Sequence, residues 1–314
     1  TVYGLGADAL DVKASAKIYA AKGRPSDNPL IVHIADMDAL YKLSSEVPKT
    51  ALKLAEKFWP GPLTMILKKS DIVPDSITGG LGTVAIRMPS HKVAAELIRK
   101  SGVYIAAPSA NTSGKPSPTL ASHVIKDLSG KIDMIIADDT VDIGVESTII
   151  DLSEEVPAIL RPGYITKEMF EEVIGRVTID PAITDGVKAG VVPRAPGMKY
   201  KHYAPKVDMI LIEGDNEKMS SSIKKILHKY ENEGKKVGLL VSDEVANELN
   251  HQNTFSYGSQ ENLAQIASEI YEGLRYFDDK DVDIILAQGT TDKGIGLAIM
   301  NRLHKASGFN SIFI

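Results

Sequence analysis

Short apolar runs alternate with amphipathic stretches through the first half of the chain. By this pattern the apolar runs predict strands and the amphipathic stretches predict helices. The predicted strands span residues 30–34, 63–68, 83–88, 103–107, 132–137, 149–152 and 158–160. The predicted helices span residues 12–21, 38–44, 49–58, 91–101, 119–128 and 167–174. Asp11 and Thr166 are suited to cap the first and last of these helices, and Gly23 lies where the first one stops.

The last third of the chain shows the same alternation. Strands are predicted at 207–213, 236–241 and 282–288, and helices at 217–230, 261–277 and 296–307. Such alternation favours a small parallel α/β domain. The segment before it is rich in Pro and Gly and has little periodicity, which is typical of a linker. The predicted organisation is a first domain over 1–175, a linker over 176–206 and a C-terminal domain over 207–314.

The end of the predicted linker has an unusual composition. Residues 194–205, RAPGMKYKHYAP, are cationic and aromatic. A passive connector does not need these residues, whereas a segment that folds over a site as a lid could use them.

Composition narrows the class of protein. Of the 314 residues, 43% are hydrophobic and 25% charged, as in a soluble globular protein with a full core. The sequence has no cysteine, which excludes disulfides, thiolate catalysis and cysteine zinc sites. There is no apolar run of membrane-spanning length and no signal-peptide pattern, and a cytoplasmic location is expected. The chain starts at Thr1 inside what resembles a motif, so we expect residues upstream of it.

The stretch KGRPSDNPLIVH, residues 22–33, is a candidate anion site. Pro25 and Pro29 make it rigid, and Lys22 and Arg24 lie two residues apart, on one face of an extended segment. Two cations in a rigid loop suit a polyanion such as a nucleotide phosphate tail. A solvated turn before a strand is an equally weighted alternative.

Other candidate residues lie at predicted strand ends. Arg87 sits inside an apolar strand, where a cation needs an anionic partner, either a structural carboxylate or a ligand carboxylate. Arg161 precedes a stiff Pro-Gly turn, and the strand at 103–107 opens into the hydroxyl-rich loop PSANTSG. Ligands of open α/β sheets gather at the carboxyl ends of strands. Neither a GxGxxG nor a Walker A pattern is present.

Three further features favour structural roles. Asp138, Asp139, Asp142 and Glu146 match no calcium loop, which predicts a solvated acidic loop rather than a metal site. His33 among apolar neighbours favours a core residue, and the single tryptophan, Trp59, favours a packed anchor.

The candidate residues suit chemistry by positioning and charge neutralisation. Neither a nucleophile elbow nor a pair of catalytic carboxylates is recognisable in the sequence. Chemistry that positions substrates and neutralises phosphate charge would use these cations and hydroxyls.

Seven motifs in this order resemble the threonylcarbamoyl-AMP synthases. They are KGRPSDNPL, FWPGPLT, TVAIRMP, APSANTSGKPSPT, ESTIIDL, ILRPG and HYAP. The chain is similar to the long form of the family, which implies a YrdC-like twisted open mixed sheet with flanking helices. A linker and a small Rossmann-like parallel α/β domain would follow. In that family Pro-Thr-Glu usually precedes the position of Thr1, which agrees with the expected upstream residues.

The resemblance implies a reaction and a set of site residues. L-threonine, bicarbonate and ATP would give threonylcarbamoyl-AMP and pyrophosphate, for modification of the adenosine next to the tRNA anticodon. Lys22 and Arg24 would be catalytic. The threonine site would comprise Thr1, His33, Arg87, Ala107 and Ser147. The ATP site would comprise Arg24, Asn28, Thr83, Ser109, Ser117, Arg161 and Tyr203.

The resemblance also implies cofactors and partners. Mg²⁺ would accompany ATP, with no protein ligand identified and no organic cofactor expected. A downstream threonylcarbamoyl transferase would consume the product, and direct tRNA contact stays open. Two rival functions are an RNA-binding module, against which the net charge of −5 argues, and a carbamoyl-transfer enzyme of hydrogenase maturation. The second is larger and carries cysteine zinc fingers, which this chain lacks.

Overall fold

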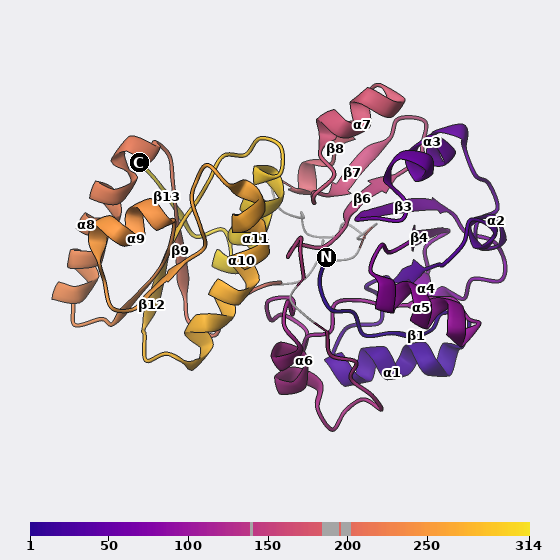
Figure 1. Ribbon diagram of the computed structural model, residues 1–314, viewed down its shortest axis with the longest axis horizontal. Coiled ribbons are helices and arrows are strands. Elements are labelled where there is room, and N and C mark those ends of the chain that lie inside the picture. The colour runs from indigo at the N-terminus through magenta and orange to yellow at the C-terminus, as the bar shows by residue number, and fades with distance from the viewer. Residues whose placement is uncertain (139–140, 184–194, 196–201) are drawn as a thin grey trace.

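The chain forms two α/β lobes, seen side by side in the computed structural model of Figure 1. The structure describes residues 1–138, 141–183, 195 and 202–314. The first lobe contains the N-terminus, which lies between the lobes, and the second carries the C-terminus at its far side (Figure 1).

The first lobe is built on an eight-stranded mixed sheet with the order β1-β5-β2-β4-β3-β6-β7-β8. Its strands are β1 (Ala7–Asp8), β2 (Ile31–His33), β3 (Leu63–Lys68), β4 (Thr83–Arg87), β5 (Ile105–Ala106), β6 (Thr148–Asp151), β7 (Ala158–Arg161) and β8 (Thr178–Ile179). Its helices are α1 (Val12–Lys22), α2 (Asp38–Leu43), α3 (Lys49–Phe58), α4 (Asp75–Thr78), α5 (Lys92–Ser101), α6 (Ala121–Leu128) and α7 (Lys167–Ile174), with the 3₁₀ turn η1 (Pro181–Ile183). The predicted mixed sheet is confirmed.

Local sequence signals place the ends of several helices. The side chain of Asp11 accepts a hydrogen bond from the amide of Lys13 at the start of α1. Gly23 ends this helix in the left-handed conformation, at φ 62°. Thr166 caps α7 through the amide of Met169. All three predicted helix-end signals are confirmed.

The centre of the sheet determines where the site forms. Strands β2 and β4 are parallel neighbours, and their register pairs His33 with Arg87. Strand β3 runs antiparallel to β4, with Thr64 opposite Arg87, and parallel to β6. Trp59 is buried at the entry to β3, where its indole N–H donates to the carbonyl of Leu63 at 2.7 Å. The predicted anchor role of Trp59 is therefore confirmed.

The second lobe is a five-stranded, all-parallel sheet with the order β11-β10-β12-β9-β13. Its strands are β9 (Met209–Glu213), β10 (Val237–Val241), β11 (Thr254–Ser256), β12 (Ile284–Gln288) and β13 (Ser311–Phe313). Its helices are α8 (Asn216–Asn232), α9 (Asp243–Leu249), α10 (Leu263–Tyr276) and α11 (Gly296–Ser307), with η2 (Phe277–Asp279). The predicted parallel α/β domain is confirmed, although β11, α9 and β13 were not predicted.

The helices of the second lobe cover both faces of its sheet. Helices α8 and α9 share an apolar cluster on the outer face, whereas α10 and α11 lie on the side that faces the first lobe (Figure 1). Val145 of the first lobe is buried in the same cluster as Ile270 of α10 and Leu303 of α11. The two lobes therefore share a buried apolar contact.

Two expectations about the chain's elements need correction. Residues 132–137 form no strand: Met134 is 74% exposed and Ile136 is 44% exposed, so this apolar run does not enter the sheet. The first sheet also extends beyond the expected boundary at residue 175, because β8 pairs with β7. Most of the predicted linker, including Arg194 and residues 196–201, lies outside the described residues.

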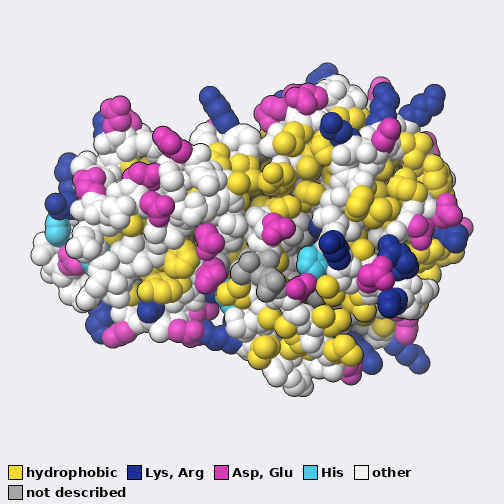
Figure 2. All heavy atoms as spheres, in the orientation of Figure 1, with side chains coloured by type: hydrophobic (Ala, Val, Ile, Leu, Met, Phe, Trp, Pro, Cys, Tyr) yellow, Lys and Arg dark blue, Asp and Glu magenta, His cyan; other side chains and the backbone are white. Residues whose placement is uncertain are grey.

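The visible surface mixes charges of both signs. On the face in Figure 2, Lys and Arg side chains stand among Asp and Glu side chains on both lobes. This face therefore differs from the continuous basic patch that is typical of nucleic-acid-binding proteins. Among the helices that the structure describes, none combines the length and apolar character required to cross a bilayer.

Candidate functional site

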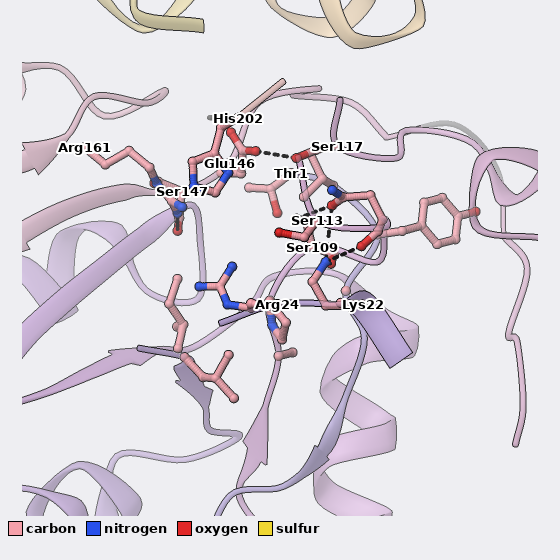
Figure 3. Close-up of a pocket in the computed structure, with 18 of the residues that line it drawn as sticks. Thr1, Lys22, Arg24, Ser109, Ser113, Ser117, Glu146, Ser147, Arg161 and His202 are labelled. Carbon is pink, nitrogen blue, oxygen red and sulfur yellow. Dashed lines mark hydrogen bonds between the residues drawn. The ribbon is translucent and has the colours of Figure 1, made fainter. Parts of the chain in front are cut away.

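A pocket opens where the carboxyl ends of β2, β4 and β7 meet the loops that follow β5 and precede β6. It encloses about 790 Å³ of space, part of it open to solvent. Figure 3 shows Arg161 toward one side of this space and the serines of the loop after β5, Ser109, Ser113 and Ser117, on the other. The predicted strand-end residues therefore converge.

Arg87 at the end of β4 presents a cation to this pocket. Its Nε donates to the carbonyl of Gly61 at 3.0 Å and its Nη1 to the hydroxyl of Thr1 at 2.9 Å. Burial, and then the neighbouring Arg161, lower the pKa of Arg87 to about 9. Within the described part of the chain no carboxylate forms an ion pair with Arg87.

His33 lies beside Arg87 as a neutral side chain. Burial, and then the positive charge of Arg87, lower the pKa of His33 to about 3. Its Nδ1 lies 3.2 Å from the carbonyl oxygen of Ile31. His33 is half-buried and lines the pocket, so it is not a plain core residue as expected.

Lys22 and Arg24 donate hydrogen bonds to backbone carbonyls of the segments that line the pocket. The Lys22 ammonium donates to the backbone carbonyls of Ser109 and Asn111, and burial, followed by Arg24, lowers its pKa well below the usual range. Arg24 Nη2 donates to the carbonyl of Pro29 at 3.0 Å. Both cations come from the end of α1 and the rigid stretch after it. Residues 25–27 of this stretch form an exposed turn, so a solvated turn is present beside the two cations that line the pocket.

The side-chain amide of Asn111 holds the loop after β5 in place. Asn111 Nδ2 donates to the carbonyls of Thr112 at 2.8 Å and Lys115 at 3.0 Å, and its Oδ1 accepts from the Ser109 hydroxyl at 2.5 Å. A closed hydrogen-bond network of this kind fixes the direction of the serines that line the pocket.

Arg161 and Ser147 are joined directly. Arg161 Nε donates to the carbonyl of Ser147 and its Nη2 to the hydroxyl of Ser147, both at 3.0 Å. The same hydroxyl lies 2.7 Å from that of Thr64. The ends of β6, β7 and β3 are thereby tied together next to Arg87.

Glu146 requires a correction to the predicted solvated acidic loop. Asp138 and Asp142 are exposed, and Asp139 lies outside the described residues, but Glu146 is buried. Its Oε2 pairs with Arg302 Nη2 of α11 at 2.9 Å, and Tyr271 of α10 donates to both carboxylate oxygens. Its counter-ion lies 156 residues further along the chain, which local sequence patterns do not reveal.

The ion pair should make stability acid-sensitive. Burial alone raises the pKa of Glu146, but Arg302 and then Arg161 outweigh it and bring the pKa to about 2, against 4.5 ordinarily. The folded state therefore gains about 3 kcal/mol that is fully present above pH 4.5 and lost as the pH falls toward 2. We expect urea unfolding between pH 6 and 3 to show a steeper loss for the wild type than for Glu146→Gln. The exposed Glu155→Gln serves as the control, and equal slopes in all three proteins would contradict the prediction.

Tyr203 and His202 close the pocket from the end of the predicted lid. Tyr203 is buried with a φ of 65°, and its ring centroid lies 5.2 Å from that of Tyr271. Burial, and then the charge of Arg24, lower the pKa of His202 to about 3. The HYAP segment thus reaches both the pocket and the second lobe.

The pocket brings together all but two of the predicted site residues. Those that line it are Thr1, Lys22, Arg24, His33, Arg87, Ala107, Ser109, Ser117, Ser147, Arg161 and Tyr203. Asn28 is buried nearby, and its carbonyl accepts from Arg24. Thr83 begins β4, about 13 Å of extended strand away from Arg87. The predicted ATP contact of Thr83 gains no support from this position.

Sequence reasoning missed several lining residues, among them Glu146, Asn111 and His202. For Asn111 and His202 a signal existed, because both lie in motifs that were recognised. For Glu146 the signal was its position directly before Ser147 at the start of an apolar strand, where a carboxylate needs a partner.

Two family models together match nearly the whole chain. Residues 1–163 match the model described as telomere recombination (Sua5, YciO and YrdC), and residues 165–308 match the C-terminal domain of threonylcarbamoyl-AMP synthase. The models meet near residue 164, ahead of the linker predicted at 176–206.

Curated relatives and a solved structure agree with these matches. A threonylcarbamoyl-AMP synthase of Pyrococcus abyssi is 50% identical over 99% of this chain and 89% of its own length, and one of Bacillus subtilis is 48% identical over 98% and 87%. The crystal structure of P. abyssi Sua5 complexed with L-threonine superposes with a TM-score of 0.95, covering 100% of this chain and 90% of that one at 50% identity. With these matches and the converging pocket, the chain belongs to the threonylcarbamoyl-AMP synthase family.

Proposed function

We propose that this chain synthesises threonylcarbamoyl-AMP from L-threonine, bicarbonate and ATP. The observation that carries the proposal is Arg87, a half-buried cation that faces the pocket and forms no ion pair within the described residues. A guanidinium at the wall of a pocket favours a carboxylate partner, which the substrate would supply. The 50% identical protein of P. abyssi was crystallised with L-threonine, which supports the same ligand here.

The proposed reaction is a nucleotidyl transfer in two stages. The threonine amine takes up bicarbonate and releases water to give a carbamate. A carbamate oxygen then attacks the α-phosphorus of ATP, and the bond from that phosphorus to pyrophosphate breaks. In this scheme Arg87 holds the threonine carboxylate, with Thr1, His33, Ala107 and Ser147 as the other residues that line the threonine site.

The cations on the nucleotide side would neutralise phosphate charge. Arg24 and Arg161 lie in the pocket together with the hydroxyls of Ser109 and Ser117. Guanidinium groups bind phosphate through two parallel hydrogen bonds, so these residues can stabilise charge as it moves onto the departing pyrophosphate. The Lys22 ammonium is directed at the loop carbonyls, so we propose that it contributes by holding that loop.

Mg²⁺ and the partners follow from the same scheme. We propose that Mg²⁺ enters with the triphosphate, because Mg²⁺ in nucleotide sites is bound largely through substrate phosphates. The labile product would pass to a downstream threonylcarbamoyl transferase in the cytoplasm.

The test is pyrophosphate release by the purified protein with ATP, Mg²⁺ and bicarbonate, with and without L-threonine. We expect release that depends on threonine and bicarbonate, together with a labile adenylate detected by mass spectrometry. If ATP binds but no pyrophosphate or adenylate forms under any substrate combination, the proposal is wrong.

A further inference from the structure

Two buried arginines of the second lobe make the same pair of contacts with the first lobe, an ion pair and a hydrogen bond to a backbone carbonyl. Arg302 of α11 pairs with Glu146 and donates through Nη1 to the carbonyl of Pro162. Arg275 of α10 pairs with Asp127 at 2.9 Å and donates through Nη2 to the carbonyl of Pro116 at 2.6 Å. Each guanidinium thus holds one carboxylate and one proline carbonyl of the other lobe.

Each proline whose carbonyl accepts from an arginine is adjacent in sequence to a residue that lines the pocket. Pro162 directly follows Arg161, and Pro116 directly precedes Ser117. The Ser117 hydroxyl in turn donates to Glu146 Oε1 at 2.6 Å, so the carboxylate that Arg302 holds also orients Ser117. Both neighbouring pocket residues, Arg161 and Ser117, belong to the nucleotide side of the proposed site.

Stability alone is a weak reason for such contacts. Arg302 is completely buried and Arg275 is 7% exposed, and the desolvation of buried ion pairs offsets most of their Coulomb energy. A planar guanidinium instead contributes orientation, because its N–H donors point in fixed directions. Arg302 and Arg275 therefore fix the loops that carry Ser117 and Arg161 relative to helices α10 and α11.

We infer that Arg302 and Arg275 are positioning residues through which the second lobe completes the ATP side of the pocket. This inference rests on the proposed function for the identity of the nucleotide. Arg302 also lies 5.9 Å from the ring centroid of Tyr203, so the same guanidinium supports the residue that closes the pocket.

The test compares Arg302→Met and Arg275→Met with Lys126→Met. Lys126 forms an exposed ion pair with Asp279 between the same two lobes, does not line the pocket, and is the matched control. We expect both arginine variants to raise the KM for ATP by about 10-fold to 100-fold, more than the KM for threonine, as misplaced binding groups do. The control should keep wild-type constants, and Arg302→Lys should recover part of the loss.

Thermal unfolding of each variant separates positioning from simple loss of structure. A variant that is fully folded at the assay temperature and retains the wild-type KM for ATP overturns the inference. The double variant Glu146→Gln/Arg302→Met removes the buried charge together with its counter-ion. If it regains wild-type stability but not ATP affinity, positioning is supported; if it regains both, Arg302 is only a counter-ion and the inference is wrong.

ATP binding is also measured alone, by calorimetry without threonine. Weakened ATP binding in the arginine variants supports the inference even if the wild type releases no pyrophosphate, in which case only the proposed synthase reaction fails. If both variants bind ATP as the wild type does and the wild type releases pyrophosphate, the inference is wrong. The proposed function is then unaffected.

Discussion

Replacing Arg87 by alanine should remove the response of pyrophosphate release to threonine. Arg87 is half-buried, and its described contacts are neutral oxygens of Gly61 and Thr1, so its charge is available for a ligand. Truncating one partner of a buried charge pair costs about 2–5 kcal/mol, equivalent to a KM increase of roughly 30-fold to several thousand-fold. Steady-state kinetics against threonine concentration, at saturating ATP, measures this effect.

The control for this variant is Arg99→Ala. Arg99 is an exposed arginine on α5 that pairs with Glu96, and its loss should leave the kinetics unchanged. Arg87→Lys keeps the charge but loses the two-pronged geometry and should fall between alanine and wild type. A KM for threonine that stays at the wild-type value in folded Arg87→Ala would show that another group binds the carboxylate.

Replacing Lys22 by methionine should weaken both the fold and ATP binding. The ammonium satisfies the carbonyls of Ser109 and Asn111, and each buried acceptor left without a donor costs about 1–3 kcal/mol. We therefore expect the free energy of unfolding to fall by roughly 2–6 kcal/mol. The freed loop would also lose the fixed direction of Ser109, so ATP affinity measured by calorimetry should fall as well.

Lys17→Met is the matched control for this variant. Lys17 is an exposed lysine on the same helix, α1, and its replacement should change neither stability nor ATP affinity. A Lys22→Met protein with wild-type stability and weakened ATP binding would contradict the loop-holding role. That result would favour direct contact of Lys22 with the phosphates, as the family resemblance implies.

Elements with strong local signals were predictable from the sequence. The bounds of α3, β3 and α11 agree with those predicted, because periodicity and a flanking Pro or Gly residue mark at least one end of each. The apolar run at 132–137 was wrongly predicted to be a strand, because a hydrophobic run predicts burial in a sheet. Here the run pairs with no neighbouring strand. Short elements such as β11 and β13 depend on tertiary pairing and carry little local signal.

The site was predictable within the first lobe and at Tyr203 of the HYAP segment, but not in the second lobe. Its motifs gave Arg87, Ser147 and Arg161, which meet because adjacent strand ends share one edge of the sheet. The contribution of Arg302 was not predictable, because an arginine on an amphipathic helix is usually solvated. Only the folded arrangement shows that its partner is Glu146 in the other lobe.

The long separation between Glu146 and Arg302 has a consequence during translation. The two residues are 156 positions apart, so a ribosome adding about 5–20 residues per second makes Arg302 roughly 8–30 s after Glu146. During that interval the emerging first lobe lacks the guanidinium that neutralises the carboxylate of Glu146. On this view the ATP side of the proposed site is complete only after helix α11 has left the ribosomal exit tunnel.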